Sequence, residues 1–192
     1  MPSRGTSGAP KFHIRDRHFC LVGRCVVATP QIPVSYVLDH AVPTLAELRW
    51  GLAHRWIEPA DVIAISLAKM KAGVELDATE EQIALLLSDE VDQVKNLLLV
   101  VDEDLPASTA PQAQIWKYLA VKRVVDTNPE FSDQLDAFDY LWCDFDHDEE
   151  LAHLVRYNPH HPERGSEVGL PAIRKYLEDY LAYTSSMDPR LR

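Results

Sequence analysis

The helical spacing of apolar residues from Thr44 onward is the feature that most constrains how this chain folds. Four large apolar residues recur at the intervals that a one-sided helical stripe requires: Leu45, Leu48, Leu52 and Trp56. Thr44 and Glu47 have the spacing of a capping box, which marks a helix start. Pro59 suits the first position of a second helix, which continues through Ala60 to Met70 and ends before Gly73.

The same signals predict further helices along the rest of the chain. Their expected starting points are Thr79, Ser88, Pro111, Ser132, Asp148 and Pro171. The helix from Thr79 is expected to run through Leu87. Short connections between about eight helices predict a mainly α fold, either an antiparallel bundle or a short α-solenoid. Residues 19–29 are rich in β-formers, so a short β-hairpin near the N-terminus is an added possibility.

A length of 192 residues suits one domain with a single core better than two domains. Residues 1–11 are rich in Pro, Gly and Ser, and we expect them to form a flexible tail. We therefore predict a single mainly helical domain over residues 12–185, followed by a C-terminal tail over residues 186–192.

The cysteine content and the absence of long apolar runs bear on location. Cys20, Cys25 and Cys143 include no Cys-x-x-Cys pair, which suits a reducing compartment better than a disulfide framework. No run approaches the ~20 apolar residues that a membrane-spanning helix needs. We expect a cytoplasmic protein.

The segment from Asp126 to Glu150 contains ten carboxylates and no Lys or Arg. The ten are Asp126, Glu130, Asp133, Asp136, Asp139, Asp144, Asp146, Asp148, Glu149 and Glu150. Five aromatic residues lie among them, so we interpret the segment as a packed element: Phe131, Phe138, Tyr140, Trp142 and Phe145. Like charges at helical spacing repel one another, and a cationic partner is the simplest reason for keeping them together.

Helical spacing divides this acidic segment into two faces. One face is apolar and carries Leu135, Phe138, Leu141, Trp142 and Phe145. The opposite face is polar, with Tyr140 among carboxylates, and we interpret it as a docking stripe in which an aromatic anchor lies among steering charges. An ordinary solvated helix face is the alternative. The predicted partner-binding residues are Asp133, Asp136, Tyr140, Asp144, Asp146, Asp148 and Glu149.

The net charge of −11 is unevenly distributed. Residues 1–30 carry five basic residues and one acid, a balance of +4, which leaves −15 for the remainder. A second acidic block over residues 75–104 has ten acids and only Lys95 as a base. An acidic body repels nucleic-acid phosphates and anionic lipid headgroups, so we expect neither nucleic acid nor membrane as a partner. The charge favours a basic protein partner.

Several possible metal ligands lie close together between Asp144 and His153. The set is Asp144, Asp146, His147, Asp148, Glu149, Glu150 and His153. Its spacing matches neither the calcium-binding loop nor the His-Glu-x-x-His pattern of zinc peptidases, so we predict no metal site, no cofactor and no catalytic residue. Two alternatives stay open: a metal-dependent hydrolase that uses the Asp144–His153 cluster, and an α-helical scaffold or adaptor.

Short motifs over about residues 44–183 resemble a bacterial protein family. They are Trp50-Gly51-Leu52, the helix from Ile57 to Gly73, Trp116-Lys117-Tyr118-Leu119, Tyr140 with Asp144-Phe145-Asp146, and Arg156-Tyr157. The family that they resemble is catalogued only as a domain of unknown function, and it overlaps the immunity proteins of contact-dependent and polymorphic toxin systems. The resemblance implies tight, stoichiometric binding that blocks the active site of a toxin.

Charge and resemblance lead to one functional hypothesis. We expect an acidic cytoplasmic binding protein whose partner is a basic protein. More specifically, we expect an immunity protein that neutralises a cognate basic toxin by occlusion through the acidic helix. No catalytic signature competes with this hypothesis in the sequence.

Overall fold

The computed structural model describes residues 31–98, 111–156 and 169–191. These ranges contain eight α-helices, one 3₁₀ helix and a single isolated β-bridge, which confirms the predicted mainly α fold. The elements are α1 (Val34–His40), α2 (Leu45–Ala53), α3 (Pro59–Lys71), α4 (Ala78–Ala84), α5 (Gln93–Leu98), α6 (Ala113–Thr127), α7 (Phe131–Asp144), η1 (Leu151–His153) and α8 (Leu170–Met187). The predicted tail over residues 1–11 and the possible hairpin over residues 19–29 lie outside the described residues.

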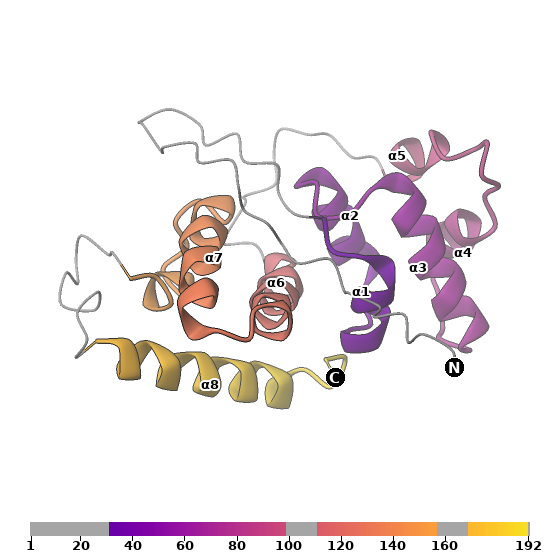
Figure 1. The fold of residues 1–192 in the computed structure, drawn as a ribbon. Helices are drawn as coiled ribbons and strands as arrows, with labels where there is room; N and C mark the ends of the chain where they lie inside the picture. The colour runs from indigo at the N-terminus through magenta and orange to yellow at the C-terminus, as the bar shows by residue number, and fades with distance from the viewer. Residues whose placement is uncertain (1–30, 99–110, 157–168, 192) are drawn as a thin grey trace, which may run out of the picture.

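The helices form two groups that meet where α2 packs against α6 (Figure 1). In the first group, α1, α2, α4 and α5 pack against α3. In the second group, α7 and α8 pack against α6, and η1 packs against α7. α8 runs beneath α6 and α7 in Figure 1 and brings the C-terminus close to α1. Within the described ranges, no helix combines the length and the apolarity that crossing a membrane requires.

Aromatic packing joins the two groups. Three tryptophans are buried: Trp50, Trp56 and Trp116. Trp56 stacks on Phe145 with 4.9 Å between the ring centroids, and the indole N–H of Trp116 donates to the carbonyl oxygen of Glu47 at 2.8 Å. Gly51 permits this close approach, because a Cβ atom there would lie 2.3 Å from Cζ2 of Trp116.

Two predicted helix starts in the first group are confirmed. Thr44 and Glu47 form the capping box at the start of α2, and the Thr44 N–H donates to Oε2 of Glu47 at 2.7 Å. Pro59 is the first residue of α3, where its missing N–H costs no hydrogen bond. These local signals involve residues only three positions apart, so they are readable in the sequence.

Other predicted boundaries are wrong. The helix expected from Thr79 through Leu87 is α4, which starts after Asp77 and ends at Ala84. The Asp77 carboxylate accepts hydrogen bonds from the N–H groups of Thr79 and Glu80, so Asp77 caps the helix in place of Thr79. α5 begins at Gln93 rather than directly after Ser88, α7 begins at Phe131 rather than after Ser132, and α1 was not expected at all.

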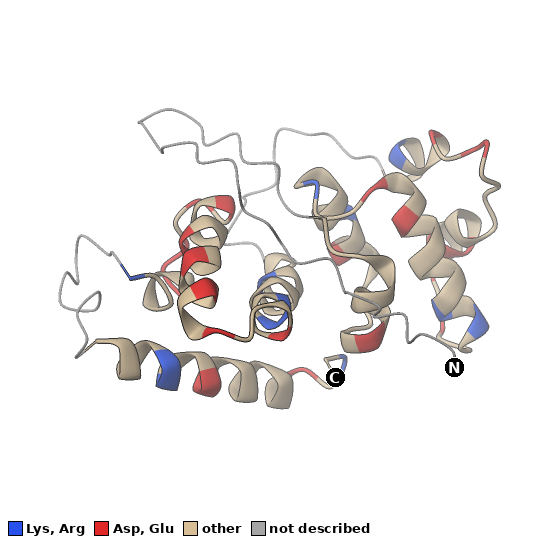
Figure 2. Ribbon diagram, in the orientation of Figure 1, with Lys and Arg blue, Asp and Glu red and all other residues tan. Residues whose placement is uncertain are grey.

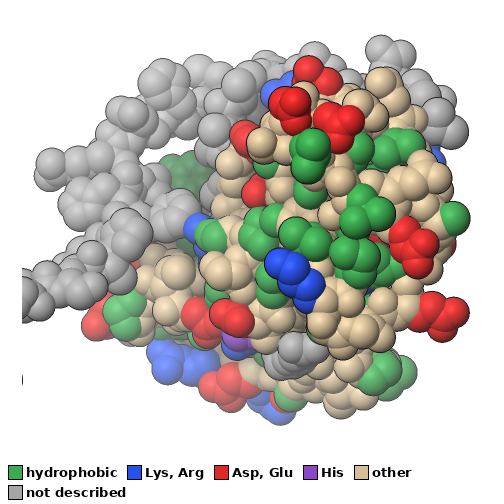
Figure 3. All heavy atoms as spheres, turned by 90° about the vertical axis from the view of Figure 1, so that its right-hand side faces the viewer, with side chains coloured by type: hydrophobic (Ala, Val, Ile, Leu, Met, Phe, Trp, Pro, Cys, Tyr) green, Lys and Arg blue, Asp and Glu red, His purple; other side chains and the backbone are tan. Residues whose placement is uncertain are grey.

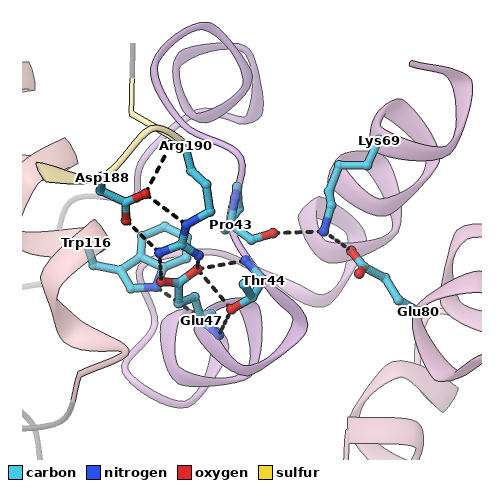
Figure 4. A network of polar contacts seen from close by, with 8 residues as sticks. All are labelled: Pro43, Thr44, Glu47, Lys69, Glu80, Trp116, Asp188 and Arg190. Carbon is cyan, nitrogen blue, oxygen red and sulfur yellow. Dashed lines mark hydrogen bonds and ion pairs between the residues drawn. The ribbon is translucent and has the colours of Figure 1, made fainter. Parts of the chain in front are cut away.

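The C-terminal residues are anchored to the first group of helices (Figure 4). Arg190 donates to both carboxylate oxygens of Glu47, at 2.7 and 3.0 Å, and to Asp188 at 2.6 Å. Leu191 is buried and forms the isolated bridge with Ala41. The prediction of a tail over residues 186–192 did not include this anchoring, because a contact between residues 143 positions apart leaves no local pattern.

A buried ion pair fixes α3 to α4 (Figure 4). The ammonium group of Lys69 lies 2.6 Å from Oε1 of Glu80 and donates to the carbonyl oxygen of Pro43 at 2.8 Å. Both side chains are buried, so each charge is stabilised mainly by the other.

Candidate protein-binding face

The two faces predicted for the acidic helix are present in α7. The apolar face is buried in the core and includes Leu135, Phe138 and Leu141. On the opposite face, Asp133 and Asp136 are exposed, while Tyr140 and Asp144 are half-buried. Figure 2 shows acidic positions along the length of α7 and no basic position on that helix.

Basic residues from other parts of the chain neutralise some of the acidic segment. Arg156 forms ion pairs with Asp136 and Asp139, the latter at 3.2 Å. Burial raises the pKa of Asp139, although the hydrogen bond and charge of Arg156 oppose that rise. Lys122 of α6 lies 3.3 Å from Asp126. The absence of Lys and Arg within the acidic segment therefore does not mean that all its carboxylates lack a partner.

Lys117 neutralises two more carboxylates from inside the fold. Its side chain is only 3% exposed, and its ammonium group lies 3.3 Å from Asp148 and 2.8 Å from Glu150. The Asp148 carboxylate also accepts hydrogen bonds from the N–H groups of Glu150 and Leu151. Asp148 is thus held in the structure that starts η1, and we leave it out of the face that a partner would contact.

Five of the ten carboxylates form no ion pair with any other described residue. They are Glu130, Asp133, Asp144, Asp146 and Glu149. Four of them follow the outer face of α7 and the turn after it, on either side of Tyr140 in the sequence. We define the acidic ridge as Asp133, Tyr140, Asp144, Asp146 and Glu149. Asp136, which the sequence also predicted as a contact residue, lies on the same helix face but is paired with Arg156.

Asp144 is the most unusual member of the acidic ridge. Burial raises the pKa of its carboxyl group to about 6, and no cation among the described residues forms an ion pair with it to oppose that rise. A charged carboxylate that is partly removed from water without a partner destabilises the folded protein. A cation placed beside Asp144 would remove this penalty.

The turn after α7 holds two non-glycine residues in the left-handed region. Asp146 has a φ of 50° and His147 a φ of 61°. Their N–H groups donate to the carbonyl oxygens of Cys143 and Trp142, which is the hydrogen-bond pattern of a Schellman motif. Glycine normally occupies the left-handed position of that motif, so the backbone conformation of Asp146 costs more than it would at a glycine, although aspartate tolerates it better than most residue types do.

Aromatic contacts stabilise this turn. The His147 ring meets the edge of Trp142 at 4.5 Å between centroids, and the indole N–H of Trp142 donates to the Asp148 carbonyl oxygen at 3.0 Å. Trp142 itself is half-buried. The turn is therefore an ordered structure that presents Asp146 and Glu149 to solvent, and sequence patterns missed it because no glycine marks it.

The residues proposed for a metal-dependent hydrolase are not gathered into a metal-binding group with other described side chains. Among the side chains that the structure describes, no group of three or more His, Cys, Asp or Glu has an arrangement suited to a metal ion. His153 packs against Tyr176, at 4.7 Å between ring centroids, and His147 packs on Trp142. The described geometry gives the hydrolase alternative no support.

Comparison with protein families identifies the group to which the chain is related. Residues 34–185 match the model of a family described as uncharacterized proteins conserved in bacteria, DUF2247. The chain belongs to DUF2247. The match covers α1 through most of α8, so the acidic ridge lies within the family's domain. No curated protein and no solved structure matches the chain.

Proposed function

We propose that this DUF2247 protein binds a cationic protein through the acidic ridge. The observation that carries the proposal is Asp144, a half-buried carboxylate that forms no ion pair with another described residue and whose pKa is raised to about 6. A residue that destabilises the free protein is typical of a site selected for binding. A partner's Lys or Arg side chain would supply the missing charge.

The rest of the acidic ridge suits the same role. Asp133, Asp146 and Glu149 are exposed charges that would attract a basic surface, and Tyr140 supplies an aromatic contact among them. The strained turn fixes the position of Asp146 relative to α7. Because these groups are held by ordered backbone, little conformational entropy would be lost on binding.

We propose further that the partner is a toxin and that the chain is an immunity protein. The support is the charge of the acidic ridge, together with the relation to toxin-immunity proteins that we expect from the sequence motifs. The mechanism is occlusion: an acidic ridge that covers a basic active-site cleft excludes the substrate of that cleft. No chemical step by this chain is needed.

A ridge variant tests the proposal directly. Replacing Tyr140→Ala, Asp144→Asn and Asp146→Asn together removes the aromatic contact and two charges but leaves the Arg156 and Lys117 ion pairs intact. The partner probe is the product of a toxin-like gene adjacent to the gene for this chain. Titration calorimetry should show binding weakened by at least about tenfold, which corresponds to ~1.4 kcal/mol.

A matched variant controls for charge and composition. Asp39→Asn, Glu178→Gln and Tyr183→Ala remove the same number of carboxylates and one tyrosine from exposed positions on α1 and α8. Its affinity should equal that of the unmodified chain. Equal affinity of the ridge and control variants would overturn the placement of the site. If the neighbouring product does not bind at all, the immunity role is overturned, and deca-arginine becomes the probe for cation binding at the acidic ridge.

A further inference from the structure

A second surface, remote from α7 in the sequence, combines exposed apolar side chains with acidic ones. Leu85 and Leu87 follow the end of α4 and are 68% and 65% exposed, and Val74, between α3 and α4, is 37% exposed. Figure 3 shows hydrophobic side chains gathered on this face, with acidic side chains around them. Large apolar side chains grouped on a surface are typical of an interaction site.

Ordered backbone presents these leucines. The N–H group of Leu85 donates to the Gln82 carbonyl oxygen as α4 ends, and the N–H group of Leu87 donates to the Glu90 carboxylate at 3.0 Å. Ile83, on the other side of α4, is fully buried. The exposed leucines are therefore outward-facing residues of a packed segment.

The sequence that contains these leucines carries charge of one sign, although Figure 3 also shows a basic side chain among the hydrophobic ones on this face. Residues 74–92 contain seven acids and no Lys or Arg. Glu80 is buried in its ion pair with Lys69, and the other six lie at the surface without an ion pair to another described residue: Glu75, Asp77, Glu81, Asp89, Glu90 and Asp92. We define the α4–α5 face as Val74, Leu85 and Leu87 with these six carboxylates. Pairing with a second copy through this face would bring like charges together, so the face fits a cationic, apolar occupant.

The chain contains one segment with that composition. Residues 11–29 carry four basic residues against Asp16 alone, and their apolar residues include Phe12, Ile14, Phe19, Leu21 and Val22. This segment lies outside the described residues and is joined to Gln31 through Pro30. The rest of the described surface offers fewer such contacts, since Tyr183 and Met187 on α8 are the only other large hydrophobics that are strongly exposed there.

The position at which residues 11–29 join the described fold lets this segment reach the α4–α5 face. Gln31 donates to the Glu58 carboxylate at 2.7 Å, and the Ile32 N–H donates to the Trp56 carbonyl oxygen, so the segment joins the fold at the N-terminal end of α3. α3 has thirteen residues and is therefore about 20 Å long. Nineteen residues of extended chain reach about 60 Å. A tethered segment also has an effective concentration in the millimolar range.

We propose that residues 11–29 bind the α4–α5 face of the same chain. The basic side chains pair with the surface carboxylates, and the apolar residues cover Leu85 and Leu87. This surface is separate from the acidic ridge, and the proposal does not depend on the function proposed for that ridge.

Disulfide trapping in the full-length chain tests the proposal, because Cys20 and Cys25 already lie in the segment. In a Leu87→Cys variant, glutathione disulfide at low protein concentration should form a bond within one chain between Cys20 or Cys25 and the new cysteine. A Met187→Cys variant is the matched control, since Met187 is also 65% exposed. We expect trapping at position 87 to be at least about tenfold faster than at position 187.

Reversing the charge of the segment tests the role of its basic side chains. Arg15→Glu with Arg17→Glu in the Leu87→Cys background should slow trapping at least about fivefold, as should raising the salt concentration to 0.5 M.

Peptide mass spectrometry identifies which cysteines are joined in the trapped products. Equal rates at positions 87 and 187, or no disulfide at position 87, would overturn the proposal. A bond between two copies through position 87 would assign the face to self-association, and a bond from Cys143 to the segment would place the segment on α7.

If Leu87→Cys disturbs the fold, Leu85→Cys is the second variant, because Leu85 is equally exposed on the same face. Circular dichroism establishes which variant is folded before trapping is measured.

Discussion

At the scale of single residues, the Asp144 carboxylate has an electrostatic cost in the folded chain. Burial raises the pKa of its carboxyl group to about 6, so the group is costly to ionise in the folded chain. In an unfolded chain an aspartic acid titrates near pH 4. Between these two values the folded protein binds the proton more tightly than the unfolded protein does. Its contribution to stability is therefore fully present below about pH 4 and is lost as the pH rises through about 6.

The Asp144→Asn variant tests this cost. Because asparagine has no charge to desolvate, the variant should be more stable than the unmodified chain by about 1–2 kcal/mol at pH 8, after allowance for solvent screening of a half-buried group. At pH 4 the difference should vanish. Urea denaturation at the two pH values measures the free energy of unfolding. A loss of stability at pH 8 would show that the carboxylate has a cationic partner.

The Asp133→Asn variant is the control for this measurement. Asp133 lies on the same face of α7 but is exposed, so its removal should leave the stability at pH 8 unchanged. An equal gain in both variants would indicate general repulsion within the acidic segment rather than burial of Asp144.

At the scale of helices, α6 holds the structure that carries the acidic ridge. Its Lys117 side chain is buried between Asp148 and Glu150, just beyond the turn that follows α7. Tyr176 of α8 donates to the Glu150 carbonyl oxygen at 3.1 Å. Contacts from two helices thus fix the segment from Asp148 to Glu150. The ion pairs of Lys117 with Asp148 and Glu150 contribute little net free energy to folding, but removing one partner from them destabilises the fold strongly.

Substitution of two lysines of α6, one at a time, compares the stability contribution of a buried ion pair with that of a surface ion pair. Lys117→Met leaves Asp148 and Glu150 without their cation and should lower the free energy of unfolding by about 3–5 kcal/mol. Lys122→Met removes the partially exposed pair with Asp126 and should cost less than about 1 kcal/mol. Urea denaturation compares the two variants. Hydrogen exchange should also quicken over residues 148–153 in the Lys117 variant alone, and similar behaviour of the two variants would contradict this account.

The acidic helix shows what sequence could and could not predict at this scale. Its buried face was predictable because Leu135, Phe138 and Leu141 recur at helical spacing within one segment. The pairing of Asp136 with Arg156 and of Asp148 with Lys117 was not, because each joins residues 20 or more positions apart. The burial of Asp144 depends on the same kind of long-range packing. The buried and exposed faces of α7 were therefore predictable from the sequence, but the division of its carboxylates into paired and unpaired groups was not.

At the scale of the whole molecule, the C-terminal segment connects the end of the chain to α2 and to the residue that follows α1. Arg190 connects Asp188 to Glu47 of α2, and Leu191 is buried beside Ala41. The hydrogen bond from Arg190 lowers the pKa of Asp188. This contribution to stability is present above the unfolded pKa of aspartic acid, near 4, and is lost as the pH falls through the lower folded value.

Removing this connection should weaken the whole fold. Arg190→Gln should lower the free energy of unfolding by about 2 kcal/mol at pH 7, because the largely buried Glu47 loses its cation. The difference from the unmodified chain should shrink below about pH 4. Lys175→Gln is the control, since it breaks only the exposed pair with Asp179 and should leave the midpoint of unfolding unchanged. A fold that unfolds at the same urea concentration without Arg190 would mean that the segment is dispensable.

The placement of Trp142 has a practical consequence. The other three tryptophans of the chain are sealed in the core, whereas Trp142 is half-buried beside His147 and hydrogen-bonded to the backbone of Asp148. Indole emission responds to the polarity around the ring, so three of the four fluorophores give a steady background and one reports on the turn that presents Asp146. Trp142 is thus an intrinsic fluorescent probe for ligands that bind at that turn, and its emission can be measured without attaching a dye.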